Sequence, residues 1–313
     1  MERKNIMYII NIKYIIFIFI CILNLLFKII NNKFYFKGAA ICMIAKNENN
    51  YIREFLLHYK DIGFKKIYLY DNNDLNKEDF NDVLKDYINS KFVQIINARG
   101  KSVFQIPAYN DCYQKNLYDY SWILFVDVDE FLYIKKNKTL IEFLKDNKFK
   151  KCQNILINYK EFGDSDLLFY DKRPLSERFI KNYRYCKSMK SFVKGGIKNA
   201  KMNIHRSYNI KNYCNSEGQR IEPGNYYTPN ISVDSAEIKH YITKTIDEFY
   251  KRLIKGWPNT KVGTESYYKF VDNRIQYFFS LNKITKIKFD KIYHLIKDKN
   301  LLNYLIQQLN KTL

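Results

Sequence analysis

Apolar runs of strand length alternate with segments of helical periodicity between residues 38 and 126, and this alternation constrains the fold more than any other feature. The predicted strands cover residues 39–45, 66–70, 92–96 and 121–126. The predicted helices cover residues 49–62, 77–89 and 105–119. Strands that alternate with helices form a mostly parallel sheet, which binds its ligands at the carboxyl ends of the strands. The predicted fold class is therefore α/β.

Beyond residue 150 the pattern is less regular. We predict a strand, then mixed β structure to about residue 240, then mainly helices, at residues 153–159, 245–255, 264–282 and 288–311. Three segments follow from this: an N-terminal hydrophobic anchor over residues 1–37, a main domain over 38–260 and a helical C-terminal extension over 261–313.

The N-terminal segment has an apolar core over residues 14–27, which is shorter than the roughly 20 residues of a spanning helix. Residues 7–30 reach that length, because Lys13 and Lys28 can extend their charged ends toward water. We predict a signal-anchor and hence a single-pass membrane localisation, with an uncleaved signal core as the alternative. Basic residues flank both ends, so the orientation stays open.

The chain is strongly basic, with a formal net charge of +21 spread along its length. A basic surface suits a nucleic acid, an anionic membrane or a phosphate-bearing substrate. A compositional bias toward Lys, Asn, Ile, Tyr and Phe explains the charge equally well. No dense basic block is present, so we predict no nucleic-acid partner.

The six cysteines include no CxxC pair, and no histidine stands at zinc-finger spacing from them. A zinc site is therefore not predicted. We expect buried thiols in a reducing compartment rather than a disulfide framework.

The strongest local motif is Asp127-x-Asp129, directly after the apolar strand at 121–126. In the turn after a strand the two carboxylates can converge on a hard divalent ion, which takes substrate phosphates as further ligands. Such an ion stabilises the negative charge of a departing diphosphate. The competing interpretation is that both aspartates only cap a turn.

A longer series of blocks resembles glycosyltransferase family 92 and related family 2 enzymes. The blocks are residues 41–74, Gln105, 108–110, Cys112, 122–132, 162–163, 177–179, 187–188, His205 and 240–257. They occur in the order of the family and cover about residues 40–260. The resemblance implies a GT-A-type nucleotide-sugar-binding fold with a mixed, mostly parallel sheet, a nucleoside-diphosphate sugar donor that is UDP-linked, and inversion at the anomeric carbon.

The resemblance also implies roles for individual residues. Asp127 and Asp129 would hold Mn²⁺ or Mg²⁺ against the donor diphosphate, with His240 as a third ligand or a phosphate contact. The residues implied to bind the nucleotide sugar are Asn47, Glu48, Asp71, Gln105, Asn110, Asp127 and Lys244.

Simpler explanations exist for several of these residues. His240 could be a packed core side chain, Asp71 a turn cap, Glu48 a residue favoured at a helix N-terminus, and Lys244 an exposed lysine at a helix start.

Inverting transfer needs a general base that takes the proton from the acceptor hydroxyl. The candidates are Glu177, Asp164, Asp166 and Glu130, of which Glu177 and Asp164 rank first. Residues 162–164 read Phe-Gly-Asp where the family carries Phe-Gly-Ser. This departure leaves the acceptor site in doubt and makes Asp164 worth testing.

We therefore predict an inverting, metal-dependent glycosyltransferase that acts at a membrane on a hydroxyl of a glycan, glycolipid or protein. The absence of GxxxxGK[ST], GxGxxG and GxSxG argues against P-loop, dinucleotide-binding and serine-hydrolase classes. Two alternatives remain: a nuclease or phosphotransferase that uses Asp127, Asp129 and Glu130, and a degenerate transferase that only binds.

Overall fold

The structure is a computed structural model that describes residues 17–24, 36–167, 169–181, 183–255 and 264–282. The chain divides into two compact units, Met1–Lys37 and Gly38–Leu313. In the first unit, residues 17–24 are helical and their large apolar side chains are exposed. Of the helices that the structure describes, none has the length and apolarity needed to cross a membrane. Most of the predicted anchor lies outside the described residues, as do the helix predicted at 288–311 and the boundary predicted at residue 260.

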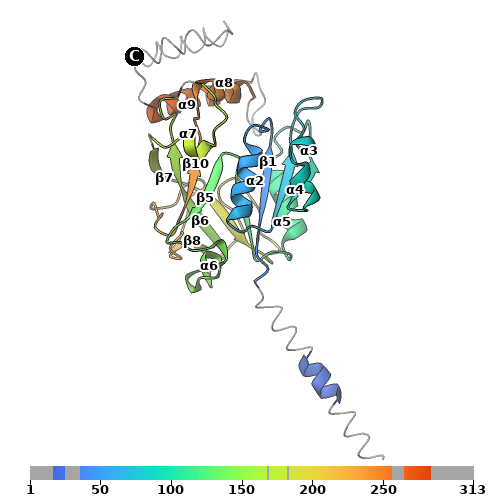
Figure 1. Cartoon of the computed structure of the whole chain (residues 1–313). Coiled ribbons are helices and arrows are strands. Elements are labelled where there is room, and N and C mark those ends of the chain that lie inside the picture. Colours follow the sequence, from blue (N-terminus) through green and yellow to red (C-terminus); the bar gives the residue numbers. More distant parts are fainter. Residues whose placement is uncertain (1–16, 25–35, 168, 182, 256–263, 283–313) are drawn as a thin grey trace, which may run out of the picture. The chain divides into compact units, whose positions relative to one another are not determined.

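One mixed sheet forms the centre of the second unit (Figure 1). Its strands are β1 (Ala39–Ala45), β2 (Lys66–Asp71), β3 (Val93–Asn97), β4 (Trp122–Phe125), β5 (Glu130–Ile134), β6 (Asn154–Phe162), β7 (Tyr183–Lys194), β8 (Tyr213–Cys214), β9 (Arg220–Ile221) and β10 (Ala236–His240). Their spatial order is β3-β2-β1-β4-β7-β6-β10-β5, with β8 beside β6 and β9 beside β8. The predicted α/β class with a mixed sheet is confirmed.

The strand directions determine where the strand ends meet. β1 runs parallel to β2 and β4, and β6 runs parallel to β10. β7 is antiparallel to both β4 and β6 and so joins these two parallel groups. The carboxyl ends of β1 and β4 therefore lie at one edge of the sheet, where parallel sheets bind ligands.

The described helices are α2 (Ile52–Asp61), α3 (Phe80–Val83), α4 (Lys85–Asn89), α5 (Gln105–Asn116), α6 (Leu140–Lys145), α7 (Leu175–Arg178), α8 (Ile246–Lys255) and α9 (Glu265–Leu281), with a short 3₁₀ helix at Asn147–Phe149. The single helix predicted at 77–89 is instead two short helices, α3 and α4. The break falls at Leu84, whose backbone dihedrals (φ −115°, ψ 15°) are not helical.

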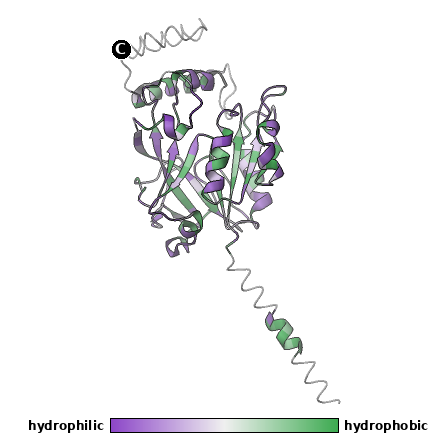
Figure 2. Ribbon diagram, in the orientation of Figure 1, coloured by the Kyte–Doolittle hydropathy of each residue, from purple (hydrophilic) through white to green (hydrophobic). Residues whose placement is uncertain are grey.

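One cluster of buried hydrophobic residues lies between α5 and the sheet. Buried side chains of β1, including Cys42 and Ile44, pack with Ala108, Tyr109 and Tyr113 of α5. All seven residues of β1 are buried, as expected for a central strand covered on both faces. Figure 2 shows hydrophobic residues concentrated along the central strands, with more hydrophilic residues on the outer helices.

Two disulfides contradict the expectation that the cysteines are core thiols. Cys42 of β1 is bonded to Cys112 of α5, and Cys152 before β6 is bonded to Cys214 of β8. The partners lie 70 and 62 residues apart in sequence. Only the folded chain brings them together, and connectivity of this kind cannot be deduced from spacing alone.

Candidate active site

The Asp127-x-Asp129 motif lies in the short segment between β4 and β5, which follow each other in the chain but are not adjacent in the sheet. β4 ends at Phe125 and β5 begins at Glu130, so both aspartates lie at the carboxyl edge of β4. The loop after β1, which carries Asn47, belongs to the same edge because β1 and β4 are parallel. The two aspartates point to different partners, and each has its own set of cations.

Asp127 is fixed by three donors from two elements. The side-chain amide of Gln105 and the hydroxyl of Tyr109, both on α5, donate to Oδ1 at 3.0 and 3.2 Å. The ammonium of Lys190 on β7 donates to Oδ2 at 2.8 Å. Burial would raise the pKa of Asp127, but the charge of Lys190 outweighs it and lowers the pKa. Asp127 is therefore an anion with a fixed orientation.

Lys190 is fully buried and forms ion pairs with two carboxyl groups. Its Nζ also lies 3.2 Å from Oε2 of Glu130. Burial alone would lower the pKa of Lys190, but the charges of Asp127 and Glu130 outweigh it and raise the pKa well above its usual range. Lys190 was not identified from the sequence, although a lysine flanked by buried strand residues is itself a signal, since buried lysines are almost always paired.

Glu130 is buried behind the motif. Its Oε1 accepts from the hydroxyl of Tyr159 at 2.8 Å, and its Oε2 accepts from the backbone N–H of Asp127 at 2.9 Å. Burial raises the pKa of Glu130 to about 8, although the charge of Lys190 opposes the shift. These contacts make Glu130 a support for the Asp127 turn.

Asp129 has a separate pair of cations. Its Oδ2 accepts from Nζ of Lys244 at 3.2 Å and from Nη1 of Arg252 at 2.6 Å. Arg252 lies on α8 and also donates to the carbonyl of Ile242 at 2.9 Å. Burial would raise the pKa of Asp129, but the charges of Arg252 and Lys244 hold it well below its usual range.

His240, the last residue of β10, completes this group. Its Nε2 lies 3.8 Å from Oδ1 of Asp129 and 3.8 Å from Oε1 of Glu130. Its ring packs on Tyr159, with the ring centroids 4.8 Å apart. Burial lowers the pKa of His240 to about 4, so the imidazole is neutral at pH 7, which is the form that binds metals. Within the described ranges, its buried Nδ1 has no hydrogen-bond partner.

Asp129 and His240 fit a shared divalent ion in chemistry and in spacing. A carboxylate oxygen and a neutral imidazole nitrogen at 3.8 Å leave room for one ion between them. Among the residues that the structure describes, no group of three His, Cys, Asp or Glu side chains is arranged to hold an ion by itself. An ion here would need further ligands from a substrate or from water.

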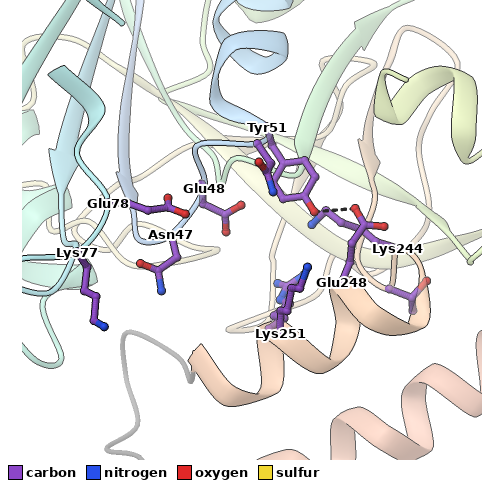
Figure 3. A pocket seen from close by; sticks show the side chains of 11 residues that line it. Asn47, Glu48, Tyr51, Lys77, Glu78, Lys244, Glu248 and Lys251 are labelled. Carbon is purple, nitrogen blue, oxygen red and sulfur yellow. Dashed lines mark hydrogen bonds between the residues drawn. The ribbon is translucent and has the colours of Figure 1, made fainter. Parts of the chain in front are cut away.

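A pocket of about 350 Å³ has Lys244 and Arg252, the two cations on Asp129, in its lining. Figure 3 shows residues of the loop after β1 on one side and residues of α8 and the segment before it on the other. It is lined by Asn47, Glu48, Asn50, Tyr51, Lys77, Glu78, Thr243, Lys244, Glu248, Lys251 and Arg252. Lys244 and Arg252 both line the pocket and contact Asp129. Of the residues predicted to bind nucleotide, Asn47, Glu48 and Lys244 belong to this lining.

Two other predicted nucleotide residues, Asp71 and Asn110, lie outside this lining, and their side chains bond other parts of the chain. Asp71 is buried at the end of β2, where its carboxylate accepts from Arg99 at 2.8 Å and from the N–H of Asn73 at 2.9 Å. The side chain of Asn73 in turn accepts from the N–H of Asn47 at 2.7 Å. The side-chain amide of Asn110 donates to the carbonyl of Met202 and accepts from its N–H. These two hydrogen bonds connect α5 to a loop that is distant in sequence.

The two leading general-base candidates differ in their surroundings. Glu177 is exposed on α7. Asp164 is buried in the turn after β6, where its carboxylate accepts from the N–H of Asp166 at 2.9 Å. β6 pairs with β10 in the register that sets Glu161 beside His240, so Asp164 follows the strand end next to His240.

The comparison that decides the family covers most of the chain. The sequence profile of glycosyltransferase family 92 matches residues 37–286. The chain belongs to glycosyltransferase family 92. A family 92 protein of Ricinus communis is 21% identical over 184 residues, which are 57% of this chain and 33% of that protein. A family 92 protein of Oryza sativa subsp. japonica is 21% identical over 176 residues, 56% of this chain and 30% of that protein.

This chain thus spans about a third of the length of these two curated relatives. Among solved structures, S. aureus TarS in complex with UDP-GlcNAc is similar with a TM-score of 0.39 and 12% sequence identity. The similarity covers 87% of this chain and 88% of that one.

Proposed function

We propose that the chain transfers a sugar from a nucleoside-diphosphate donor, UDP-linked, to an acceptor hydroxyl. Membership of family 92 supports the reaction class. The observation that carries the proposal for the site is the double role of Lys244 and Arg252. Both cations line the pocket and contact the second aspartate of the motif, so a diphosphate in the pocket would meet both.

The lining of the pocket combines cations, which suit a diphosphate, with carboxylates, which suit hydroxyl groups. Lys77 and Lys251 add two further cations to the lining. The carboxylates of Glu48 and Glu78, beside Asn47, offer acceptors for hydroxyl groups of a ribose or a sugar (Figure 3). Arginine and lysine bind phosphate oxygens through charge-assisted hydrogen bonds.

We propose that Asp129 and His240, with Asp127 nearby, hold Mn²⁺ or Mg²⁺ together with the donor phosphates. Bound there, the ion would neutralise charge that develops on the departing diphosphate. Lys244 and Arg252 would orient the same phosphates and so share in stabilising that charge.

For the acceptor side we propose inversion with Asp164 as general base. Asp164 is preferred over Glu177 because it is buried at the end of β6, next to the strand that carries His240. The acceptor would be a glycan, a glycolipid or a protein hydroxyl. Residues 1–37 would attach the domain to a membrane as a single-pass anchor. Since disulfides persist in oxidising compartments, we place the domain outside the cytosol.

Equilibrium binding of UDP tests the pocket assignment. Arg252→Met removes one of the two cations on Asp129, so we expect the Kd for UDP to rise about tenfold, or about 1.4 kcal/mol. Arg53→Met is the control, because Arg53 is an exposed arginine on the outer side of α2. An unchanged UDP affinity in Arg252→Met, with the protein folded, would contradict the assignment. Metal-dependent cleavage of phosphodiesters without a sugar nucleotide would favour a nuclease or phosphotransferase instead.

A further inference from the structure

A second ion pair is buried beside the pocket and does not touch the motif. Arg178 of α7 donates through Nη1 and Nη2 to the two carboxylate oxygens of Glu248 on α8, at 2.9 and 3.0 Å. Their side chains are only 1% and 2% exposed. The guanidinium is held further by the carbonyl of Arg173 and lies over the ring of Phe179. A buried ion pair adds little net stability compared with apolar residues of the same volume, and its best-attested use is to fix geometry.

Glu248 gathers contacts from three separate parts of the chain. Besides Arg178, it accepts from the hydroxyl of Tyr51 at 2.6 Å and from the N–H of Thr245 at 3.1 Å. Tyr51 begins α2 across the pocket, and Figure 3 shows its hydroxyl pointing to Glu248. Thr245 precedes the first turn of α8. One carboxylate thus joins α7, the start of α2 and the start of α8.

Glu248 lies midway in sequence between Lys244 and Arg252, the two cations on Asp129. Lys244 is four residues before Glu248, and Arg252 is four residues after it. Nζ of Lys244 lies 4.8 Å from the ring centroid of Tyr51, the same tyrosine that bonds Glu248. Arg252 follows Glu248 by about one helical turn, so both project from the same side of α8. We therefore expect the orientation of Lys244 and Arg252 to depend on the contacts that fix Glu248.

Arg178 also controls the charge of the pocket. Glu248 lines the same pocket as Lys244 and Arg252. Without Arg178, its carboxylate would be an unpaired negative charge beside the phosphate-binding cations. It would compete for Lys244 and repel a diphosphate.

We propose that Arg178 and Glu248 are positioning residues that hold Lys244 and Arg252 toward the donor diphosphate while keeping the charge of Glu248 neutralised. Neither residue contacts the reacting atoms. The proposal rests on the assignment of the pocket as the diphosphate site. It gives the Glu177-Arg178-Phe179 block a role that depends on the arginine rather than on the glutamate.

The test compares UDP with uridine, because only UDP carries the phosphates. With the full chain, we expect Arg178→Met to raise the Kd for UDP about tenfold or more and to leave the Kd for uridine within about twofold. Arg178→Lys keeps the charge but loses the bidentate geometry, so we expect a smaller loss of about threefold to tenfold. In the double variant Arg178→Met/Glu248→Gln, removal of the repelling charge should restore part of the UDP affinity.

The matched control is Glu237→Gln. Glu237 is also a buried carboxylate in an ion pair, with Lys135 at 2.8 Å, but it lies outside the pocket lining. We expect this variant to leave the ratio of UDP to uridine affinity unchanged.

Two results would overturn the proposal. The first is an equal loss of UDP and uridine affinity in both Arg178 variants, which would mean a structural role alone. The second is a change of the ratio in Glu237→Gln as large as in Arg178→Lys. If the unaltered chain itself binds UDP no more tightly than uridine, the pocket assignment fails, and this result is visible before any variant is made.

Discussion

The ammonium of Lys190 lies 2.8 Å from Oδ2 of Asp127, with its side chain entirely excluded from solvent. An apolar side chain on β7 would fill the position of Lys190 equally well if packing were its only role. The contact turns the first carboxylate of the motif toward β7, whereas Asp129 accepts from Lys244 and Arg252, which line the pocket. The two aspartates of one short motif therefore have different surroundings and different proposed roles.

Replacement of this lysine should be severely destabilising. Lys190→Met would leave the carboxylate of Asp127 and the buried carboxyl group of Glu130 without their cationic partner, which costs about 3–5 kcal/mol of unfolding free energy. Chemical denaturation measures the loss. Lys115→Met is the control, since its exposed ion pair with Asp111 should contribute less than about 1 kcal/mol. Similar losses in the two variants would contradict this account of Lys190.

The general base can be assigned by comparing two isosteric variants. We expect Asp164→Asn to lower kcat by about 10²–10⁴-fold, with little effect on the KM for the donor, because a base acts only in the chemical step. Glu177→Gln should stay within about twofold of the unaltered chain, since Glu177 is exposed. Steady-state kinetics with donor and acceptor give both values. The reverse pattern would assign the role to Glu177.

His205 should make the folded state sensitive to acid. Its Nδ1–H donates to the carbonyl of Met189 at 2.9 Å, and burial, followed by the charge of Lys190, lowers its pKa to about 4. The unfolded chain binds this proton below about pH 6.5, whereas the folded chain binds it only near pH 4. Stability is therefore lost as the pH falls through this window, by an amount on the order of 3 kcal/mol for this group.

The pH dependence is measured by denaturant unfolding at pH 7 and at pH 4.5. His205→Gln should lose less stability between these two values than the unaltered chain does. Equal losses in both proteins would mean that His205 is not shielded from protonation in the folded state.

The disulfides give a direct chemical prediction. Alkylation of the denatured chain without reductant should label only Cys21 and Cys186, the free cysteines. After reduction it should label all six. Cys42→Ser with Cys112→Ser should lower the unfolding free energy by about 2–4 kcal/mol, and Cys186→Ser should change it much less. Six labelled cysteines without reductant would contradict both disulfides.

Local sequence patterns predicted the strands that are buried on both faces. The run at 39–45 identifies β1 because a strand covered on both faces is apolar throughout. The motif at Asp127 was visible because it directly follows such a strand. Asn47 and Glu48 could be expected near it because parallel strands end at one edge.

Contacts between distant segments could not be predicted in this way. Arg252 lies 123 residues from Asp129 in sequence, and a single arginine on an amphipathic helix gives no sign of its partner. Asn110 was expected beside the nucleotide, but its amide is bonded to the backbone of Met202. The role of Arg178 could not be predicted, because its partner Glu248 lies 70 residues away in sequence.

The central claim is that the pocket lined by Lys244 and Arg252, the two cations on Asp129, binds a nucleotide sugar for transfer. The most direct test is nucleotide release by the full chain from a panel of nucleotide sugars, with Mn²⁺ or with a chelator, in the unaltered protein and in Asp129→Asn. The account predicts release from one UDP-sugar that requires the ion and falls at least about 100-fold in Asp129→Asn. A folded chain that neither binds UDP nor releases nucleotide from any donor, or whose activity survives Asp129→Asn unchanged, would contradict it.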